Sequence, residues 1–275
     1  MSGRIPERRL LAGALFLACL AFGQPALAQT PNTVFLEALT WTELRDLVHA
    51  GKTTVIIPIG GVEENGPQMA LGKHDVRVKI LSERIARALG NALVAPVLAY
   101  VPEGHIHPPT GHMGFPGTIT IPESAFVETL IGAARSMKSA GFRDIVFLGD
   151  HGGYQHLDEV AADRLDRRWA KSGVRAHAIH EYYRASYEGF NRILAQRGFS
   201  RAEIGTHAAL ADTSLTLALA PSLVRQNLLK SGRKFDAKDG VYGDPTKASA
   251  ALGELGVRQI VERTVAAIKK AVARR

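Results

Sequence analysis

Cysteine is nearly absent from this sequence of 275 residues, which contains only Cys19. The chain after that position therefore has no thiolate to serve as a metal ligand or nucleophile, and no pair of thiols to form a disulfide. Tryptophan occurs twice, and aromatic residues make up only 7% of the chain. Any metal site beyond Cys19 must therefore be built mainly from histidine and carboxylate side chains.

Two motifs of common enzyme classes are also missing. The chain has no Gly-x-Ser-x-Gly nucleophile elbow and no Gly-x-x-x-x-Gly-Lys-Ser/Thr phosphate-binding loop. Its formal net charge is +8, but the basic residues form no stripe interleaved with aromatic residues. We therefore expect no nucleic-acid partner.

Residues 1–28 have the three parts of a secretory signal peptide in the usual order. Arginines come first, an apolar stretch covers residues 10–23, and a small-x-small sequence ends at Ala28. The apolar stretch is too short to span a bilayer comfortably, and a buried N-terminal helix is the alternative. We predict removal of residues 1–28 and Sec export to the periplasm or the medium, with no membrane attachment afterwards. Arg8 and Arg9, directly before the apolar stretch, leave the twin-arginine route open.

Four apolar stretches rich in valine and isoleucine have the length of β-strands that are buried on both faces. They cover residues 55–59, 92–97, 144–149 and 174–179. Helical patterns, with apolar residues spaced by three and four, cover residues 76–89, 124–140, 155–171, 208–220 and 253–273. The alternation predicts a doubly wound α/β layer with a parallel sheet. We expect a single domain from residue 33 to residue 275.

Polar side chains follow two of the predicted strands at the point where each strand ends. Glu63 lies just after the first strand, Asp75 just before the next helix, and His151 among glycines after the strand at 144–149. The carboxyl ends of parallel strands meet at one edge of a sheet, where α/β proteins bind their ligands. Glu63, Asp75 and His151 would form a three-ligand metal site with positions open to water. The alternatives are a solvated glutamate, a helix-capping aspartate and a hydrogen-bonded loop histidine.

A second polar group lies at the start of the predicted helix at 208–220. His207 is a candidate general acid or base, because imidazole titrates near neutral pH. Asp212 is a candidate metal ligand, or a residue that orients a ligand. The alternative is that Thr206 and the charged first turn simply cap this helix.

Four blocks between about residue 39 and residue 224 resemble the creatininase (creatinine amidohydrolase) family, and they occur in the same order. Residues 55–75 resemble its opening block, a buried strand followed by Glu-x-His-Gly-Pro-His and a later Asp. The other three blocks resemble His-x-x-Phe-Pro-Gly-Thr at 112–118, Asn-Gly-His-Gly-Gly at 148–153 and His-Ala-Gly-x-x-Glu-Thr-Ser at 207–214. Four blocks together are far more specific than any one of them.

The resemblance implies a three-layer α/β/α sandwich and a site for one or two divalent metals, with zinc first and manganese or iron as alternatives. It implies hydrolysis of a cyclic or linear amide by a water molecule whose pKa the metal lowers. It also implies a homo-oligomer, and a hexamer in particular, because members of the family tend to form hexamers. By position, Glu63, Asp75 and His151 match metal ligands, and His207 matches a histidine near the substrate.

The sequence departs from the family at several of these positions. Asn65 and Gln68 stand where the family has histidines, and an amide binds a transition metal more weakly than imidazole does. An extra residue before Asp75 makes its neighbour His74 a candidate replacement ligand. Asp212 stands in for a glutamate and remains a candidate ligand.

Further departures concern the loop around His151. Asp150 replaces a glycine, Gly153 replaces a glutamate that is a ligand in creatininase itself, and Tyr154 replaces an asparagine. We expect His112 and Tyr154 to bind substrate. Because residues 181–207 contain no tryptophan, creatinine itself is not the expected substrate.

These observations and the family resemblance lead to a metal-dependent hydrolase that cleaves a C–N amide bond of a small-molecule substrate, with His207 moving protons. The alternative is a periplasmic binding or scaffold protein that kept the fold and lost hydrolysis, which Asn65 and Gln68 favour. Lactone hydrolysis at the same site is a third hypothesis, because it differs only in the leaving atom.

Overall fold

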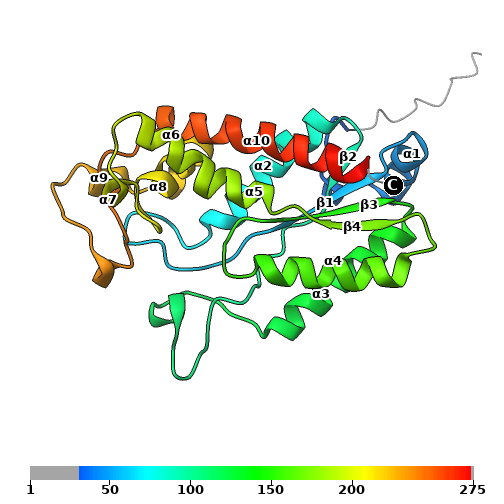
Figure 1. Cartoon of the computed structure of the whole chain (residues 1–275), viewed down its shortest axis with the longest axis horizontal. Coiled ribbons are helices and arrows are strands. Elements are labelled where there is room, and N and C mark those ends of the chain that lie inside the picture. Colours follow the sequence, from blue (N-terminus) through cyan, green and yellow to red (C-terminus); the bar gives the residue numbers. More distant parts are fainter. Residues whose placement is uncertain (1–30, 274–275) are drawn as a thin grey trace, which may run out of the picture. The chain divides into compact units, whose positions relative to one another are not determined.

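A parallel sheet of four strands forms the centre of the structure, a computed structural model that describes residues 31–273. The predicted signal peptide lies outside the described residues. In the sheet the strands have the order β2-β1-β3-β4, and each pairs in parallel with its neighbours (Figure 1). Their bounds are β1 Thr54–Ile59, β2 Ala92–Val94, β3 Asp144–Gly149 and β4 Arg175–Ala178. The predicted α/β class with a parallel sheet is confirmed.

Helices cover both faces of this sheet, which confirms the predicted three layers (Figure 1). Helices α2 (Lys73–Leu89) and α10 (Ala250–Val272) lie on one face, and α3 (Glu123–Ser139) and α4 (Gln155–Trp169) lie on the other. The remaining helices are α1 Trp41–His49, α5 Glu181–Arg184, α6 Phe190–Gln196, α7 Arg201–Ile204, α8 Leu210–Leu219 and α9 Gln226–Leu229. Within residues 31–273, no helix is both long enough and apolar enough to cross a membrane.

The hydrophobic core explains why the strand sequences are apolar without interruption. Every residue of β1 and β3 is buried, because helices pack on both sides of these central strands. Helix α2 contributes Val78, Leu81 and Ile85, which share one face of the helix and have no exposed surface. Helix α8 packs against α10 at the other end of the same layer.

The carboxyl ends of β1 and β3 define the edge where polar residues gather. Ile59, the last residue of β1, is the register partner of Gly149, the last residue of β3. The chain after each strand therefore leaves the sheet at the same level. Helix α2 begins at Lys73, three residues before the predicted start, and this extra turn carries Lys73 and His74 to the same edge.

Glycine is required where α10 crosses α8. A Cβ atom added at Gly253 would overlap the backbone carbonyl of Ser214, whereas a Cβ added at Gly132 on α3 would meet open space. We expect Gly253→Ala to lower the free energy of unfolding by about 1–3 kcal/mol through overpacking. Gly132→Ala is the control and should raise it by up to about 1 kcal/mol, since alanine favours helix. Urea denaturation measures both, and equal stability of the two variants would contradict the packing argument.

Asp158 on α4 gives stability a measurable dependence on pH. Its side chain is buried, Oδ1 has no hydrogen-bond partner among the described residues, and burial raises its pKa well above the usual range. The folded state therefore holds a proton that the unfolded state has lost above about pH 4, so stability falls as pH rises towards the folded-state pKa. We expect a slope of up to about 1.4 kcal/mol per pH unit that Asp158→Asn removes.

Urea titrations of the wild type and the variant at several pH values between about 5 and 7 would measure this slope. Asp163→Asn, an exposed position on the same helix, is the matched control and should leave the slope unchanged. A wild-type slope equal to that of Asp158→Asn would show that the buried carboxyl is ionised in both states.

Candidate metal centre

The carboxylate of Glu63 lies at the middle of the polar cluster and has no exposed surface. On one side, Oε2 lies 3.2 Å from Nε2 of His112 and 3.4 Å from Nε2 of His151. On the other side, Oε1 lies 2.7 Å from Nε2 of His74 and 3.7 Å from Nζ of Lys73. Glu63 and His151 are therefore brought together, as the parallel strand ends predict.

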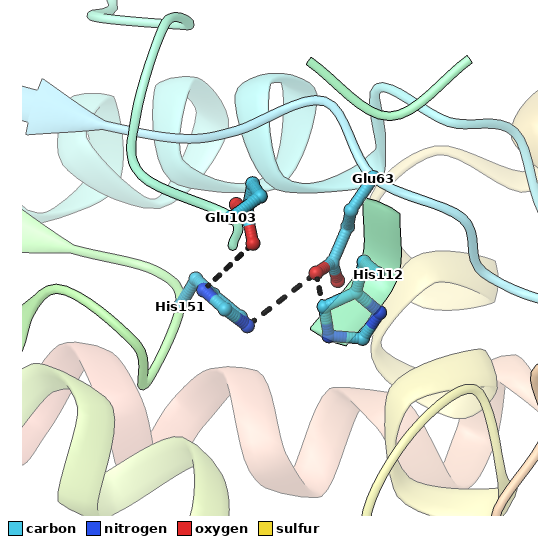
Figure 2. Close-up of side chains that lie close together, drawn as sticks. All are labelled: Glu63, Glu103, His112 and His151. Carbon is cyan, nitrogen blue, oxygen red and sulfur yellow. Dashed lines mark ion pairs between the residues drawn. The ribbon is translucent and has the colours of Figure 1, made fainter. Parts of the chain in front are cut away.

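A second carboxylate, that of Glu103, joins Glu63 from the loop between β2 and α3 (Figure 2). Its Oε2 lies 3.4 Å from Nδ1 of His151. One ligand atom each of Glu63, Glu103, His112 and His151 lies within 4.8 Å of the other three. Two carboxylates and two imidazoles are a donor set that suits zinc, manganese or iron.

Unsatisfied oxygens within this set test whether it fits a cation. Oε2 of Glu63 and both carboxylate oxygens of Glu103 are buried without a hydrogen-bond partner in the part of the chain that the structure describes. Buried carboxylate oxygens without partners are costly, and a divalent cation bound by one oxygen of each glutamate would offset part of this cost. The residues therefore fit one metal ion.

The pKa values of the ligands agree with this interpretation. Burial would raise the pKa of Glu63, but the charges of His74 and Lys73 and the hydrogen bond of His74 outweigh burial and hold that pKa well below its usual range. Burial lowers the pKa of His151 to about 3, which leaves a neutral imidazole that can ligate a metal. Burial, together with the charge of Glu63, raises the pKa of Glu103 to about 9. A bound cation would relieve the repulsion between these two glutamates.

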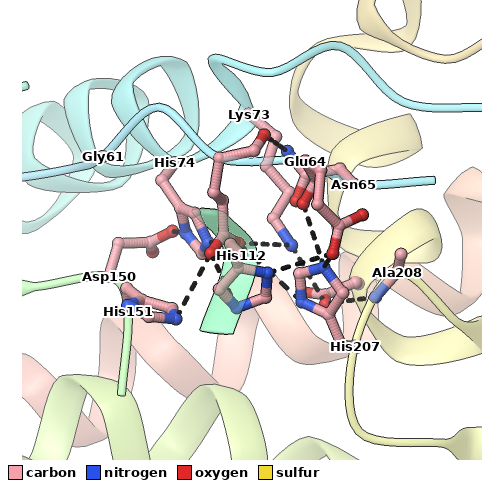
Figure 3. A network of polar contacts seen from close by, with 12 residues as sticks. Gly61, Glu64, Asn65, Lys73, His74, His112, Asp150, His151, His207 and Ala208 are labelled. Atoms are coloured by element: carbon pink, nitrogen blue, oxygen red, sulfur yellow. Dashed lines mark hydrogen bonds and ion pairs between the residues drawn. The ribbon is translucent and has the colours of Figure 1, made fainter. Parts of the chain in front are cut away.

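Glu64 holds two histidines at once (Figure 3). Its Oε1 lies 3.0 Å from Nδ1 of His112 and 3.1 Å from Nε2 of His207, and the amide of Gly66 donates to Oε2. Burial opposes ionisation, but these hydrogen bonds outweigh it and lower the pKa of Glu64 to about 2. An ionised Glu64 accepts a hydrogen bond from one N–H of each ring, so in the neutral form of each ring the lone pair is on Nε2 of His112 and on Nδ1 of His207.

Asp75, expected to be a metal ligand, lies outside the group of four. Its Oδ1 accepts a hydrogen bond of 2.9 Å from the amide of Gly61 and packs so closely on Gly60 that a Cβ there would collide with it. The physical reason is the early start of α2, which turns the neighbouring His74 towards Glu63 in place of Asp75. Asp75 thus holds the turn that follows β1.

His74 also differs from its expected role as a replacement ligand. Its two ring nitrogens lie 2.6 Å from Oδ2 of Asp150 and 2.7 Å from Oε1 of Glu63. Both nitrogens are therefore engaged, and a metal bond would break one of these contacts. Asp212 is engaged too, because its carboxylate pairs with Lys73 at 3.1 Å and with Arg77 at 2.9 Å.

Asn65 and Gln68 turn away from the cluster. The amide nitrogen of Asn65 donates to the carbonyl oxygens of Glu63 at 2.9 Å and Ala70 at 3.1 Å. That of Gln68 donates to the carbonyl oxygen of Ala208 at 2.6 Å. The amide nitrogens fasten the loop that carries Glu63, whereas Oδ1 of Asn65 and Oε1 of Gln68 are buried without a hydrogen-bond partner among the described residues.

Tyr154 lies beneath the site, and the expected contact with substrate is not formed by its buried side chain. Its hydroxyl lies 2.9 and 2.6 Å from the carbonyl oxygens of Ile59 and Gly60. It also accepts hydrogen bonds of 3.1 Å from the amides of Asp150 and His151. Tyr154 therefore ties the end of β1 to the end of β3. His112, the other expected substrate contact, lies in the site.

The cluster borders a pocket of about 160 Å³. His112, His151 and His207 line it together with Lys73, Arg77 and Asp212. Residues of the segment after β4 line the rest, among them Tyr183, Tyr187 and Asn191. The rings of Tyr183 and Tyr187 are stacked, with their centroids 5.8 Å apart. The volume suits a small molecule or the end of a linear one.

Sequence reasoning missed Glu103, Glu64 and Lys73. Glu103 lies in an irregular loop, and its only signal is an acidic residue between Pro102 and Gly104. Glu64 directly follows Glu63, and only Glu63 matches a ligand position of the family, so there was no separate signal for Glu64 in the sequence. Lys73 lies inside the block at 55–75, but a lysine at the start of a helix is usually exposed to solvent.

A family model places the whole arrangement among known proteins. The model described as creatinine amidohydrolase matches residues 37–268. The chain belongs to the creatininase family.

Curated members of the creatininase family that resemble this chain carry the names of hydrolases. A 3-dehydro-scyllo-inosose hydrolase of Thermotoga maritima is 24% identical over 72% of this chain and 60% of its own length, which is less than two thirds. A mycofactocin precursor peptide peptidase of Mycolicibacterium smegmatis is 28% identical, with coverage of 81% and 87%. Creatinine amidohydrolase of Pseudomonas putida is 26% identical, with coverage of 70% and 74%. The prediction of an enzyme is confirmed at the level of the family.

Solved structures of creatininase share the fold. A manganese form is 25% identical, with a TM-score of 0.69 and coverage of 87% of this chain and 98% of that one. A zinc–zinc form of a mutant creatininase is 24% identical, with a TM-score of 0.70 and coverage of 88% and 99%. The predicted family and fold are therefore both confirmed.

Measuring the metal affinity of variants tests whether Glu103 or Asp75 is the metal ligand. Loss of a residue that only supports a ligand typically weakens metal binding 10–100-fold, so Glu103→Gln, which removes a direct ligand, should weaken Mn²⁺ binding at least about 100-fold. Asp75→Asn is the control and should change the affinity by less than about threefold, because its amide oxygen can still accept from Gly61. Isothermal titration calorimetry of both variants measures this. The opposite order of effects would restore Asp75 as the ligand.

Proposed function

We propose that this protein is an exported metal-dependent hydrolase that cleaves the C–N bond of an amide in a small molecule. The observation that carries the proposal is the group of Glu63, Glu103, His112 and His151, with buried carboxylate oxygens that lack partners, beside the pocket. Export is supported by the signal-peptide pattern of residues 1–28. Assembly into a homo-oligomer, a hexamer by the family resemblance, is part of the proposal.

The four ligand residues would hold the metal through two carboxylates and two neutral imidazoles. A divalent cation at such a site lowers the pKa of water and polarises a carbonyl group. Zinc is the first choice, supported by the zinc–zinc form of a mutant creatininase, and manganese is supported by the manganese form of creatininase. Nδ1 of His112 is held by the carboxylate of Glu64, and Nε2 therefore faces the cluster.

In this proposal His207 moves the protons that amide hydrolysis requires. Its Nε2 is tied to the carboxylate and the backbone carbonyl of Glu64, at 3.1 and 3.0 Å. Its Nδ1 has no hydrogen bond among the described residues and lies 3.8 Å from Oε1 of Glu63, on the side of the pocket. Nδ1 can take a proton from the attacking water and pass it to the leaving nitrogen.

Proton delivery favours amides over lactones. An amine is a poor leaving group until its nitrogen is protonated, whereas the oxygen of a lactone leaves more readily without that proton. The alternative of a non-catalytic binding protein rests on Asn65 and Gln68, whose side chains turn out to fasten a loop. Neither amide is among the four residues of the proposed metal site.

Substituting His207 tests its role. His207→Gln should lower kcat for an amide substrate by roughly 10²–10⁴-fold, because general acid–base catalysis contributes about that much. Bound metal per chain should stay unchanged, since the ligand set is intact. His156→Gln, at an exposed position on α4, is the control and should keep wild-type kcat. A matched ester substrate should lose less activity than the amide in His207→Gln.

Removal of the metal tests the proposal as a whole. A panel of cyclic amides, linear amides and short peptides would be assayed before and after chelation, and again after addition of Zn²⁺ or Mn²⁺. We expect amide hydrolysis that chelation abolishes and the metal restores. Hydrolysis that survives complete removal of metal, or a protein that binds neither ion at micromolar concentrations, would refute the proposal.

A further inference from the structure

The two oxygens of Glu63 lie in different surroundings. Oε2 faces His112 and His151 and has no hydrogen-bond partner, so it is free for a metal. Oε1 already receives a hydrogen bond of 2.7 Å from His74 and faces the ammonium of Lys73 at 3.7 Å. The same carboxylate therefore has one side open to a cation and one side occupied by nitrogen groups.

Lys73 is a buried cation in the middle of the site, with 1% of its surface exposed. Its Nζ lies between Oε1 of Glu63 and Oδ2 of Asp212, which is 3.1 Å away. Charged lysines are rarely buried unless they are paired, and here the partners are two carboxylates. Figure 3 shows Lys73 reaching into the same network as the histidines.

The surroundings of Lys73 would otherwise suit a metal. Oε1 of Glu63 and Oδ2 of Asp212 face its Nζ at 3.7 and 3.1 Å, and Nδ1 of His207 lies 3.8 Å from the same Oε1. Two carboxylate oxygens and an imidazole nitrogen form a common ligand set for a divalent ion. The ammonium supplies positive charge at that point.

We propose that this centre binds a single metal ion, and that the ammonium of Lys73 takes the place of a second one between Glu63 and Asp212. The proposal rests on the proposed function, because it assumes a metal at Glu63, Glu103, His112 and His151. It separates this chain from the zinc–zinc form of the mutant creatininase. The built-in cation cannot dissociate, so one of the two cations of the centre does not depend on metal supply.

The group of Glu64, His112 and His207 does not offer a second site in its place. Its three side chains already bond to one another, with Glu64 accepting from both rings. A metal there would remove the proton from Nδ1 of His112, whose Nε2 faces the first site. A second ion would thus have to share one imidazole with the first.

The test counts metal ions per chain after saturation with Mn²⁺ and, separately, Zn²⁺, by calorimetry and by elemental analysis after dialysis. Wild type should bind one ion. Lys73→Gln, which removes the charge but keeps a polar side chain of similar length, should bind a second ion. Lys79→Gln is the matched control, because Lys79 lies on the same helix but is half-exposed and pairs with Glu37; this variant should bind one ion.

Each result bears on a different claim. Two ions in the wild type, or one ion in a folded Lys73→Gln, would overturn the role given to Lys73 and leave the proposed function intact. No ion in the wild type would refute the proposed function itself. If Lys73→Gln does not fold, anomalous scattering from manganese-soaked wild-type crystals decides. One peak beside Oε2 of Glu63 supports the proposal, and a peak beside Oε1 overturns it.

Discussion

The carboxylate of Glu63 carries a negative charge and has no contact with solvent. The rest of the site is organised around this constraint. A buried carboxylate without compensation is unstable in a medium of low dielectric, so positive charge or N–H groups must surround it. The chain meets this need on one side with Lys73 and His74. On the other side it leaves an oxygen without a partner, where the binding of a cation is favourable.

The compensating charges are themselves part of an alternating network. Arg77 lies between Asp150 and Asp212, and Asp150 also receives the hydroxyl of Tyr182 at 2.5 Å. Desolvation opposes the charge of Asp150, but Arg77 and His74 outweigh it and lower its pKa. Positive and negative groups thus alternate from β3 to α8, and removal of any one would leave a neighbour buried and unpaired.

The elements with strong local signals could be predicted from the sequence. Apolar strands bounded by glycine indicated the parallel sheet, and the meeting of strand ends placed Glu63 near His151. The direction of side chains at the start of α2 could not be predicted, because helix boundaries are uncertain by several residues and each residue turns a side chain by about 100°. For this reason Asp75 was expected beside Glu63, whereas the structure has His74 there. Glu103 was out of reach for another reason, since an irregular loop has no periodicity that reveals where its side chains point.

The position of Glu103 has a consequence for how sites of this kind are compared. Gly153 packs beside His151 and approaches the backbone of Pro102, so the loop that carries Glu103 lies next to the position where a carboxylate is missing. Glu103 thus brings a carboxylate beside His151, although residue 153 itself is a glycine. A comparison of sequences position by position would miss this carboxylate. A carboxylate oxygen can reach the space beside His151 from the loop that carries Glu103 or from the loop that carries Gly153. Ligands of such sites are therefore better compared by their position in space than by their position in the sequence.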